Sequence, residues 1–547
     1  MSLAYALLLV AIGANPARLA AISPLSLPSP TVEGTAADTI VVCPGTFRAA
    51  LEPWLQYRRQ QGRRIAVVSN LGSPDDIRGR IREAASGGRL RFVLLVGAAD
   101  YNMVYDSAIR ERCVPMHYAK ARVNVLWGST PTISTDNWYV QGESATDEMP
   151  TPALAIGRIP AESPDELQDI VTKIMAYERS TDFGPWRQRM NFVAGTGNFG
   201  ILADTILESA AQYFLTNSIP AEYRVSMTQG NWQSPYCPDP RRLHQTAIDR
   251  LNEGALFWVY IGHGYHRGLA RMEVPGGEYP ILEIADAEAL RCHQGRPIAL
   301  FLSCFAGAID ARERCLASAL LRSPGGPVAV SAGTRVTMPY AMTVMATCMT
   351  DEVFATKTET LGEALLHSKQ KMLEEASTTD RRRALLDSIA SAVSPAAHQL
   401  AAERAEHVLM FNLIGDPLLQ LRHPKSLRID APAKATAGTT LDVAGNCTVD
   451  GPGRLELVLR RDLVRDPPPQ RGAYPRTAEA LAQFQDAYYR ANDRCLQAVS
   501  LQVRDGRFHA QIDLPASARG MCHFSLLVSG QDDFALGATD VEIVKRP

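Results

Sequence analysis

Two residues suited to nucleophilic and acid–base chemistry follow long apolar runs. His263 stands between Gly262 and Gly264 after ALFWVYI, and Cys304 follows PIALFLS. A thiolate is a strong nucleophile, and an imidazole can accept its proton and return it to a leaving group. The pair therefore predicts covalent acyl transfer with Cys304 as nucleophile and His263 as acid/base partner. The amides of Gly264 and Cys304 are the candidates for an oxyanion hole.

These residues need a scaffold that brings strand ends together. From about residue 40 to residue 421, short β-branched runs such as IVVC, IAVVS and RFVLLVG alternate with helical patterns. This alternation predicts an α/β fold with a parallel sheet and crossover helices. Ligands bind beyond the carboxyl ends of such strands. The roughly forty residues between His263 and Cys304 suffice for one crossover, so we expect both side chains to face one cleft.

The two ends of the chain depart from this pattern. Residues 3–14 (LAYALLLVAIGA) have the length of a signal-peptide core but lack a positive flank, so a secreted or periplasmic location, slightly favoured, and a buried helix both stay open. Residues 23–39, rich in Pro, Ser and Thr, predict a linker. From residue 422 to the C-terminus, period-two segments predict a β-sandwich, interrupted by a surface-lying helical insertion at 466–493.

Composition excludes several classes of protein. The 56 Lys and Arg residues balance 58 Asp and Glu residues without a basic patch, which argues against nucleic acid as a partner. Charged residues interrupt every apolar run, so a polytopic membrane protein is excluded and no lipid partner is evident. The ten cysteines form no CxxC pair, which argues against a zinc ribbon or a disulfide scaffold. We expect no metal or cofactor in the reaction and a protein or peptide as substrate.

Further motifs give the pair a family context. The order of GHG and Ser303-Cys304 resembles the gingipain family of cysteine peptidases, relatives of caspases and legumains. TDNWYVQGE, ALAIGRIPAESPDELQDIVTKIMAYE, LGEALLHSK and FNLIGDPLLQL are similar to further segments of that family. The resemblance implies a caspase-like architecture of two subdomains, at 40–177 and 178–421, followed by an immunoglobulin-like β-sandwich at 422–547. It also implies cysteine endopeptidase activity through the Cys304 and His263 dyad.

The resemblance extends to the substrate pocket. It places Asp204 at the position of the carboxylate that binds the arginine side chain in arginine-specific members, so cleavage after basic residues is expected. The alternative is that Asp204 has only a structural role, as a carboxylate in the first turn of a helix. The tryptophan-bearing wall of the family's pocket is replaced around Thr337 and Met338, and Met338 is the candidate substrate contact there. A structural calcium ion is a further implication of the resemblance.

Other functions remain open beside the peptidase. Residues 195–200 (GTGNFG) match GxGxxG, the dinucleotide-binding fingerprint, but the next strand, RVSMTQ, has no acidic residue for the ribose. A sortase-like transpeptidase would use the same dyad and pass the acyl group to an amine. A non-catalytic binding module is the third alternative. His266 forms HxxH with His263, and without a third ligand we interpret it as a solvated loop histidine.

Overall fold

The computed structural model describes residues 37–100, 103, 105–195, 218–377, 380–394, 397–461, 471–475 and 477–546. The predicted leader at 3–14 lies outside the described residues. No helix within these ranges is both long enough and apolar enough to cross a membrane.

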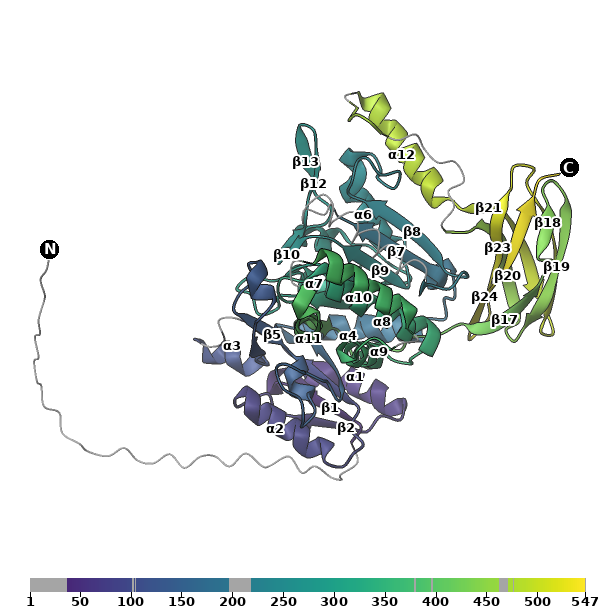
Figure 1. Cartoon of the computed structure of the whole chain (residues 1–547). Helices are drawn as coiled ribbons and strands as arrows, with labels where there is room; N and C mark the ends of the chain where they lie inside the picture. Colours follow the sequence, from purple (N-terminus) through teal and green to yellow (C-terminus); the bar gives the residue numbers. More distant parts are fainter. Residues whose placement is uncertain are drawn as a thin grey trace, which may run out of the picture. The chain divides into compact units, whose positions relative to one another are not determined.

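Ten strands of the described chain form one central sheet (Figure 1). Their order across the sheet is β2 (Ile65–Val68), β1 (Thr39–Val42), β3 (Phe92–Val96), β6 (Ala155–Ile159), β16 (Phe411–Ile414), β15 (Ala329–Gly333), β14 (Ile298–Leu302), β9 (Phe257–Ile261), β7 (Arg189–Ala194) and β8 (Arg224–Gln229). The prediction of an α/β fold with a large, mainly parallel sheet is confirmed.

One strand reverses the direction of the sheet. β16 pairs antiparallel with β15 and parallel with β6, while the remaining neighbours pair parallel. The sheet therefore consists of two parallel halves that run in opposite directions. The apolar patterns did not predict this reversal, because they carry no information on strand direction. The two predicted subdomains share this sheet, and their boundaries at residues 177 and 421 remain predictions.

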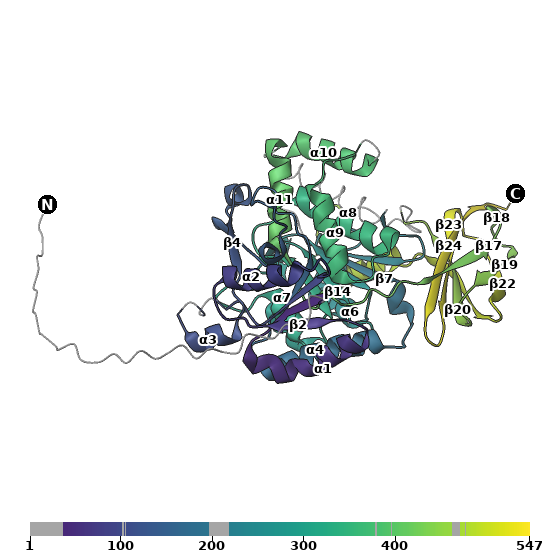
Figure 2. The same ribbon diagram turned by 90° about the horizontal axis from the view of Figure 1, so that it is seen from below.

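Helices cover both faces of the sheet (Figure 2). One face carries α1 (Arg48–Gln60), α4 (Pro164–Arg179) and α7 (Leu316–Arg322), and the other carries α8 (Pro339–Thr350), α9 (Leu361–Leu373), α10 (Arg381–Val393) and α11 (Leu400–Met410). Further elements of the described chain are α2 (Pro74–Ala85), α3 (Ser107–Arg112), α6 (Leu243–Asn252), β4 (His117–Lys120), β5 (Thr132–Thr135), β10 (Gly264–Tyr265), β11 (Gly268–Leu269), β12 (Met272–Val274), β13 (Gly277–Tyr279) and the 3₁₀ helix η3 (Asn124–Trp127).

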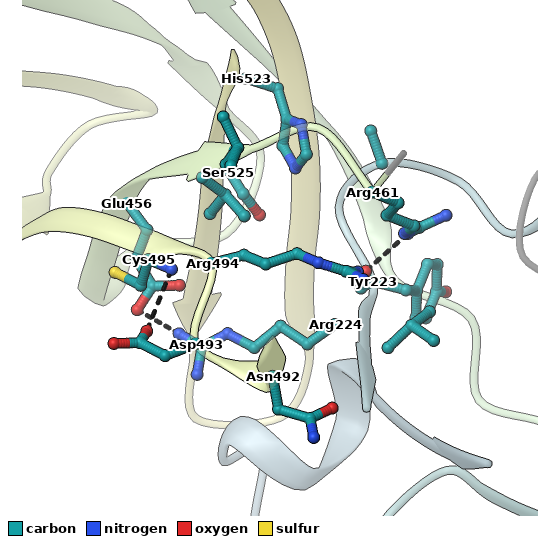
Figure 3. Close-up of a pocket in the computed structure, with 14 residues that line it drawn as sticks. Tyr223, Arg224, Glu456, Arg461, Asn492, Asp493, Arg494, Cys495, His523 and Ser525 are labelled. Atoms are coloured by element: carbon teal, nitrogen blue, oxygen red, sulfur yellow. Dashed lines mark hydrogen bonds and ion pairs between the residues drawn. The ribbon is translucent and has the colours of Figure 1, made fainter. Parts of the chain in front are cut away.

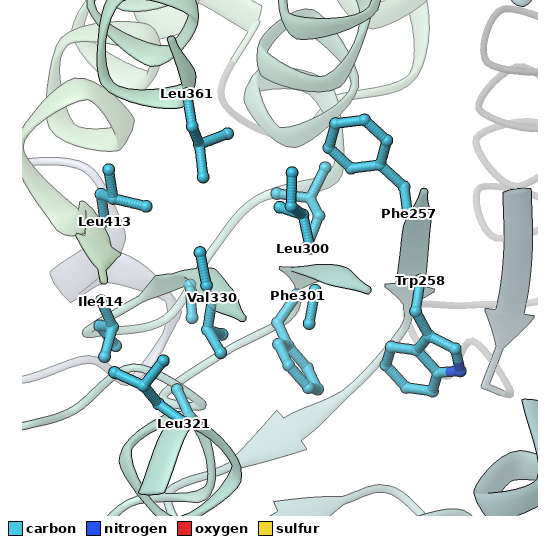
Figure 4. Close-up of a cluster of buried hydrophobic side chains, with 14 of the residues drawn as sticks. Phe257, Trp258, Leu300, Phe301, Leu321, Val330, Leu361, Leu413 and Ile414 are labelled. Atoms are coloured by element: carbon cyan, nitrogen blue, oxygen red, sulfur yellow. The ribbon is translucent and has the colours of Figure 1, made fainter. Parts of the chain in front are cut away.

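The strands that precede the predicted catalytic residues are apolar on both faces. Phe257 and Leu300 point toward Leu361 of α9, whereas Trp258 and Phe301 point toward the opposite layer (Figure 4). Successive side chains of a strand alternate between faces, so a strand covered on both sides must be apolar throughout. The fixed packing of β9 and β14 determines where each strand ends and its loop begins.

The C-terminal region forms a separate β sheet. Its strands are β17 (Lys425–Asp430), β18 (Lys434–Thr436), β19 (Thr440–Cys447), β20 (Gly451–Leu459), β21 (Cys495–Val503), β22 (Arg507–Asp513), β23 (Gly520–Ser529) and β24 (Phe534–Val544). The sheet order begins at β21 and ends at β22, and these two strands meet through a bridge between Arg504 and Arg507. The sheet thus nearly closes on itself. Its immunoglobulin-like character remains a prediction.

The predicted helical insertion between these strands is α12 (Ala478–Asn492), and it does more than lie on the surface. The side-chain amide of Asn492 accepts a hydrogen bond from the amide of Met227 at 2.7 Å and donates to its carbonyl at 3.0 Å. Tyr488, which is buried, shares a hydrogen bond with Thr228. Because β8 is an edge strand with unpaired backbone groups, α12 protects that edge from pairing with another chain.

Candidate functional site

The structure places His263 and Cys304 at equivalent positions beyond two neighbouring strands. β9 and β14 pair in parallel, with Ile261 opposite Leu302. His263 and Cys304 each follow two residues after this pair. Adjacent strands lie about 4.8 Å apart. The two predicted catalytic residues therefore lie next to each other at the same edge of the sheet.

The backbone of His263 is held from two directions. The Tyr260 hydroxyl donates a hydrogen bond to the His263 carbonyl at 2.8 Å, and the Ala270 amide donates to the same oxygen at 3.0 Å. Burial raises the pKa of Tyr260, so the hydroxyl remains protonated and available as a donor. Gly262, at φ 149°, provides the sharp turn between β9 and the histidine.

Gly264 brings the histidine loop against the cysteine loop. A Cβ atom at this position would lie 2.9 Å from the Cys304 carbonyl oxygen and 2.9 Å from the Ser303 hydroxyl, closer than real Cβ contacts. Gly264 also pairs with Leu269 in the β10–β11 hairpin. Since Ala270 donates to His263, this pair is of the non-hydrogen-bonded kind, and the Gly264 amide points away from β11. The hairpin therefore does not use the Gly264 amide.

Cys304 sits on a strained turn. The next residue, Phe305, has φ 56°, a left-handed conformation that costs a non-glycine residue about 1–2 kcal/mol. Strain of this kind persists where the surrounding structure enforces it and is concentrated at functional sites. The Phe305 amide donates to the Arg335 carbonyl at 3.1 Å, which fixes the turn.

Cys304 differs from the other thiols in its surroundings. All ten cysteines are free, and only Cys304, Cys348 and Cys495 are partly exposed. Burial raises the pKa of Cys348 to about 12 and also raises that of Cys495, which disfavours their thiolates. Cys304 alone among these three follows a strand of the central sheet directly.

The segment after β15 supplies a hydrogen bond to the cysteine sulfur. The Thr337 amide donates to Sγ of Cys304 at 3.3 Å, and the Thr337 hydroxyl lies 3.7 Å from the same atom. Sγ also lies 3.8 Å from the Thr337 carbonyl oxygen, to which the thiol can donate. A buried ion pair holds this segment, because Arg335 contacts the Asp310 carboxylate at 2.7 and 3.0 Å. Asp310 belongs to the loop that begins at Cys304.

Helix α11 fixes the same segment from the opposite side. Nε2 of His407 accepts a hydrogen bond from the Met338 amide at 2.8 Å, and the Glu403 carboxylate accepts one from the Ala341 amide at 3.0 Å. Nδ1 of His407 lies 2.7 Å from the Glu403 carbonyl oxygen. Burial lowers the pKa of His407 to about 4, so the ring is neutral and its Nε2 atom is an acceptor.

The other predicted site residues differ in whether the structure describes them and in how far they are exposed. Met338 lies beside Thr337, but only 7% of it is exposed. Asp204 lies outside the described residues, as do residues 196–200 of the GxGxxG match. His266 is partly exposed and lies 4.0 Å from Glu313, as expected of a loop histidine.

Sequence reasoning missed the residues that support the pair. Thr337 attracted notice only as a departure from the family pattern. Tyr260 did carry a signal, since a tyrosine within a strand buried on both faces needs a partner for its hydroxyl. Glu403 and His407 gave none, because charged residues within a helix ordinarily face solvent.

Other clusters of polar residues have structural explanations. The pocket in Figure 3 is lined by Arg224, Arg461 and Arg494, among others. Arg461 is directed at backbone carbonyls, including that of Tyr223 at 2.6 Å, and Arg224 pairs with Glu456. Across the described parts of the chain, no three His, Cys, Asp or Glu side chains gather to hold a metal ion. The predicted calcium ion therefore has no candidate ligand set of this kind among those residues.

Comparison with known proteins decides the family. The model of Peptidase family C25 matches residues 33–422. The chain belongs to this family. C25 is the gingipain family of cysteine peptidases, as the motifs indicated, and the match includes both His263 and Cys304. No curated protein matches the chain significantly in sequence.

Solved structures share the fold. The Arg-specific cysteine proteinase gingipain R (RgpB) is 17% identical, with a TM-score of 0.51 over 94% of this chain and 100% of that one. A complex of Porphyromonas gingivalis RgpB pro- and mature domains is also 17% identical, with a TM-score of 0.51 over 93% of this chain and 100% of that one. A third structure, described only as a protease, is 13% identical, with a TM-score of 0.51 over 93% and 98% of the two chains.

Proposed function

We propose that the chain is an endopeptidase in which Cys304 and His263 form the catalytic dyad. The observation that carries the proposal is the register of β9 and β14, which brings both residues to one edge of the sheet. The Cys304 thiolate attacks the carbonyl carbon of a peptide bond. His263 then protonates the departing amine, which leaves an acyl-enzyme.

The surrounding backbone serves the charged steps of this reaction. The Thr337 amide donates a hydrogen bond to the sulfur that makes the attack. The amides of Gly264 and Cys304 donate to the oxygen that becomes negative in the tetrahedral intermediate. In the second half of the reaction, neutral His263 removes a proton from water, which attacks the acyl-enzyme and releases the second product.

Transfer to an amine is the second candidate outcome. A sortase-like transpeptidase uses the same acyl-enzyme, and only the acceptor differs. The partial exposure of Cys304 favours hydrolysis, because water can reach the acyl-enzyme. A peptide substrate supplied with a competing amine distinguishes the two by the ratio of hydrolysed to transferred product.

Basic-residue specificity forms a finer part of the proposal. It rests on the family match and on Asp204 as the carboxylate that pairs with a substrate guanidinium. Met338 would line the same pocket. Asp204→Asn should weaken transition-state stabilisation for cleavage after arginine by about 2–5 kcal/mol, because the substrate guanidinium is left poorly paired. A substrate with a small neutral residue at that position should be affected much less.

Two accessory features follow from the family resemblance. We propose an immunoglobulin-like class for the C-terminal β domain and a structural calcium ion. A rise in melting temperature on addition of calcium, reversed by a chelator, would support the ion. An unchanged melting temperature on addition of calcium would contradict the proposed calcium ion.

The experiment that tests the dyad compares wild type with Cys304→Ala, His263→Ala and the double variant. Each single variant should lose nearly all peptidase activity, and the double variant should be no worse, because the residues act as one unit. Cys348→Ala is the matched control, since this thiol is also partly exposed. Near wild-type turnover in either single dyad variant would exclude the dyad.

A further inference from the structure

Two large apolar side chains are exposed on a loop close to the predicted nucleophile. Leu126 is 63% exposed and Trp127 is 36% exposed. Both belong to η3, a short 3₁₀ helix that ends at Gly128 in the left-handed conformation. Large apolar side chains that are exposed next to each other are typical of binding surfaces.

The η3 loop is attached to the segment that contacts Cys304. The Asn124 side chain donates to the Val336 carbonyl at 3.5 Å, and the Ser129 hydroxyl accepts from the Val336 amide at 3.4 Å. Val336 directly precedes Thr337, whose amide donates to the Cys304 sulfur. The residues on both sides of the exposed pair are therefore bonded to the residue that precedes Thr337, the contact of the Cys304 sulfur.

A buried carboxylate makes the start of this loop rigid. Glu406 of α11 accepts hydrogen bonds from the backbone amides of Val123 and Asn124, each at 2.8 Å, and from that of Arg122. Glu406 is 5% exposed. A carboxylate that accepts several backbone N–H groups at the start of a helical turn stabilises that turn strongly. Leu126 and Trp127 are thus presented on a preorganised loop, which lowers the entropic cost of binding.

We infer that Leu126 and Trp127 form an apolar subsite for a large hydrophobic side chain of the peptide substrate. The inference rests on the proposed peptidase function and deepens it by naming a second specificity determinant. An extended peptide advances about 3.3 Å per residue, so a residue within a few positions of the scissile bond can reach the loop. The occupant is the substrate because the loop adjoins the segment that holds Cys304.

The subsite makes a prediction about substrate choice. Peptides that are identical except for Phe or Leu in place of Ser at positions near the scissile bond should be cleaved with higher kcat/KM by the wild type. Burial of one such side chain is worth about 1.5–3 kcal/mol, which corresponds to roughly 10- to 150-fold. The Leu126→Ala, Trp127→Ala double variant should lose most of this preference, so that its ratio of kcat/KM for the Phe peptide to kcat/KM for the Ser peptide falls toward 1.

The test compares this double variant with a matched control. Leu385→Ala with Tyr489→Ala removes two exposed apolar side chains of similar size, 51% and 57% exposed, from α10 and α12. The control should retain the full preference for the Phe or Leu peptide. Trp127→Phe should retain more of this preference than Trp127→Ala, because phenylalanine keeps an aromatic ring at that position. Melting temperatures of all variants show whether a loss of preference comes from a change in stability.

Three outcomes separate the subsite from the dyad. Loss of the apolar preference in the double variant alone supports the subsite. Cleavage that depends on Cys304 but shows the same preference in wild type and double variant overturns the subsite and leaves the dyad intact. Absence of any Cys304-dependent cleavage overturns both. Calorimetry on Cys304→Ala protein, which does not cleave, measures the affinity for the Phe and Ser peptides directly. The Phe peptide should bind more tightly than the Ser peptide, and this difference should be lost when Leu126 and Trp127 are also replaced by alanine.

Discussion

The amide of Thr337 donates a hydrogen bond to the sulfur of Cys304 at 3.3 Å. The donor comes from the segment after β15, and the acceptor from the loop after β14. The proposed nucleophile is thus contacted by the segment that follows a neighbouring strand, and the histidine loop lies against its backbone carbonyl. The geometry of both loops, rather than the identity of the dyad alone, is expected to set the activity.

Gly264→Ala tests the contact between the two loops. The added methyl group would approach the Cys304 carbonyl oxygen to 2.9 Å and displace the His263 loop. Misplacement of a catalytic group by about 1 Å can cost roughly 100-fold in rate, so kcat should fall by that order. Gly277→Ala is the control, because a Cβ there meets no atom within 4 Å. Equal activity of the two variants would show that the contact is unimportant.

Tyr260→Phe tests the support of His263. Loss of the 2.8 Å bond to the His263 carbonyl should lower the free energy of unfolding by about 1 kcal/mol and reduce kcat several-fold. Tyr139→Phe is a matched control, since its hydroxyl donates to the Pro115 carbonyl at 2.6 Å from a similarly buried position. It should cost similar stability without loss of kcat. A parallel fall of kcat in both variants would point to a general effect of stability.

The Arg335–Asp310 ion pair should contribute both to the free energy of unfolding and to kcat. Arg335→Met leaves Asp310 buried without its partner, which should cost about 3–5 kcal/mol in unfolding free energy. The kcat of the folded fraction should also fall, because the turns at Phe305 and Thr337 lose their support. Arg158→Met breaks the comparable pair with Asp136 elsewhere in the sheet. It should cost similar stability but leave the kcat of the folded fraction unchanged, and an equal fall there would contradict the proposed role of Arg335.

His407 should make the enzyme sensitive to acid. Its pKa is lowered to about 4 in the folded state from an ordinary value near 6.5, so folding favours the neutral ring. This contribution is complete above pH 6.5 and is lost as the pH falls toward 4, with a maximum of about 3 kcal/mol. His407→Gln does not titrate and should lack this part of the pH dependence.

Urea unfolding of both proteins between pH 4 and pH 7 measures the difference. The comparison is needed because burial raises the pKa of Glu403 to about 7, and its contribution is lost in the opposite direction as the pH rises. Glu403 is present in both proteins, so its effect is common to them. Parallel pH profiles would exclude His407 as the source of acid sensitivity.

The sequence predicted the strands of the sheet well, because strands buried on both faces appear as continuous apolar runs. It did not predict that β16 inserts between β6 and β15 with reversed direction relative to β15. It also did not predict that α12 covers the edge of β8, since the contact is made by two side chains, Tyr488 and Asn492. Pairing between distant segments leaves no periodic signal.

The family motifs turned out to be largely structural. Arg158 of GRIP and Asp136 of TDNWY form a fully buried pair, and Asp416 of GDP binds Arg58 together with Glu178. Buried charges of this kind require partners and tolerate little change, which makes their sequence context distinctive. The shortest contact of Thr337 with the sulfur is through its backbone amide, and nearly every residue type has such an amide. For this reason the sequence could not reveal its role.

The most direct test of the central proposal is covalent labelling. The protein is treated with a peptidyl inhibitor that carries a thiol-reactive group, and the modified residue is identified by mass spectrometry. Labelling of Cys304 that is abolished by His263→Ala is the predicted result, because the nucleophile requires its acid/base partner. Modification of Cys348 or Cys495 in place of Cys304 would contradict the proposed dyad.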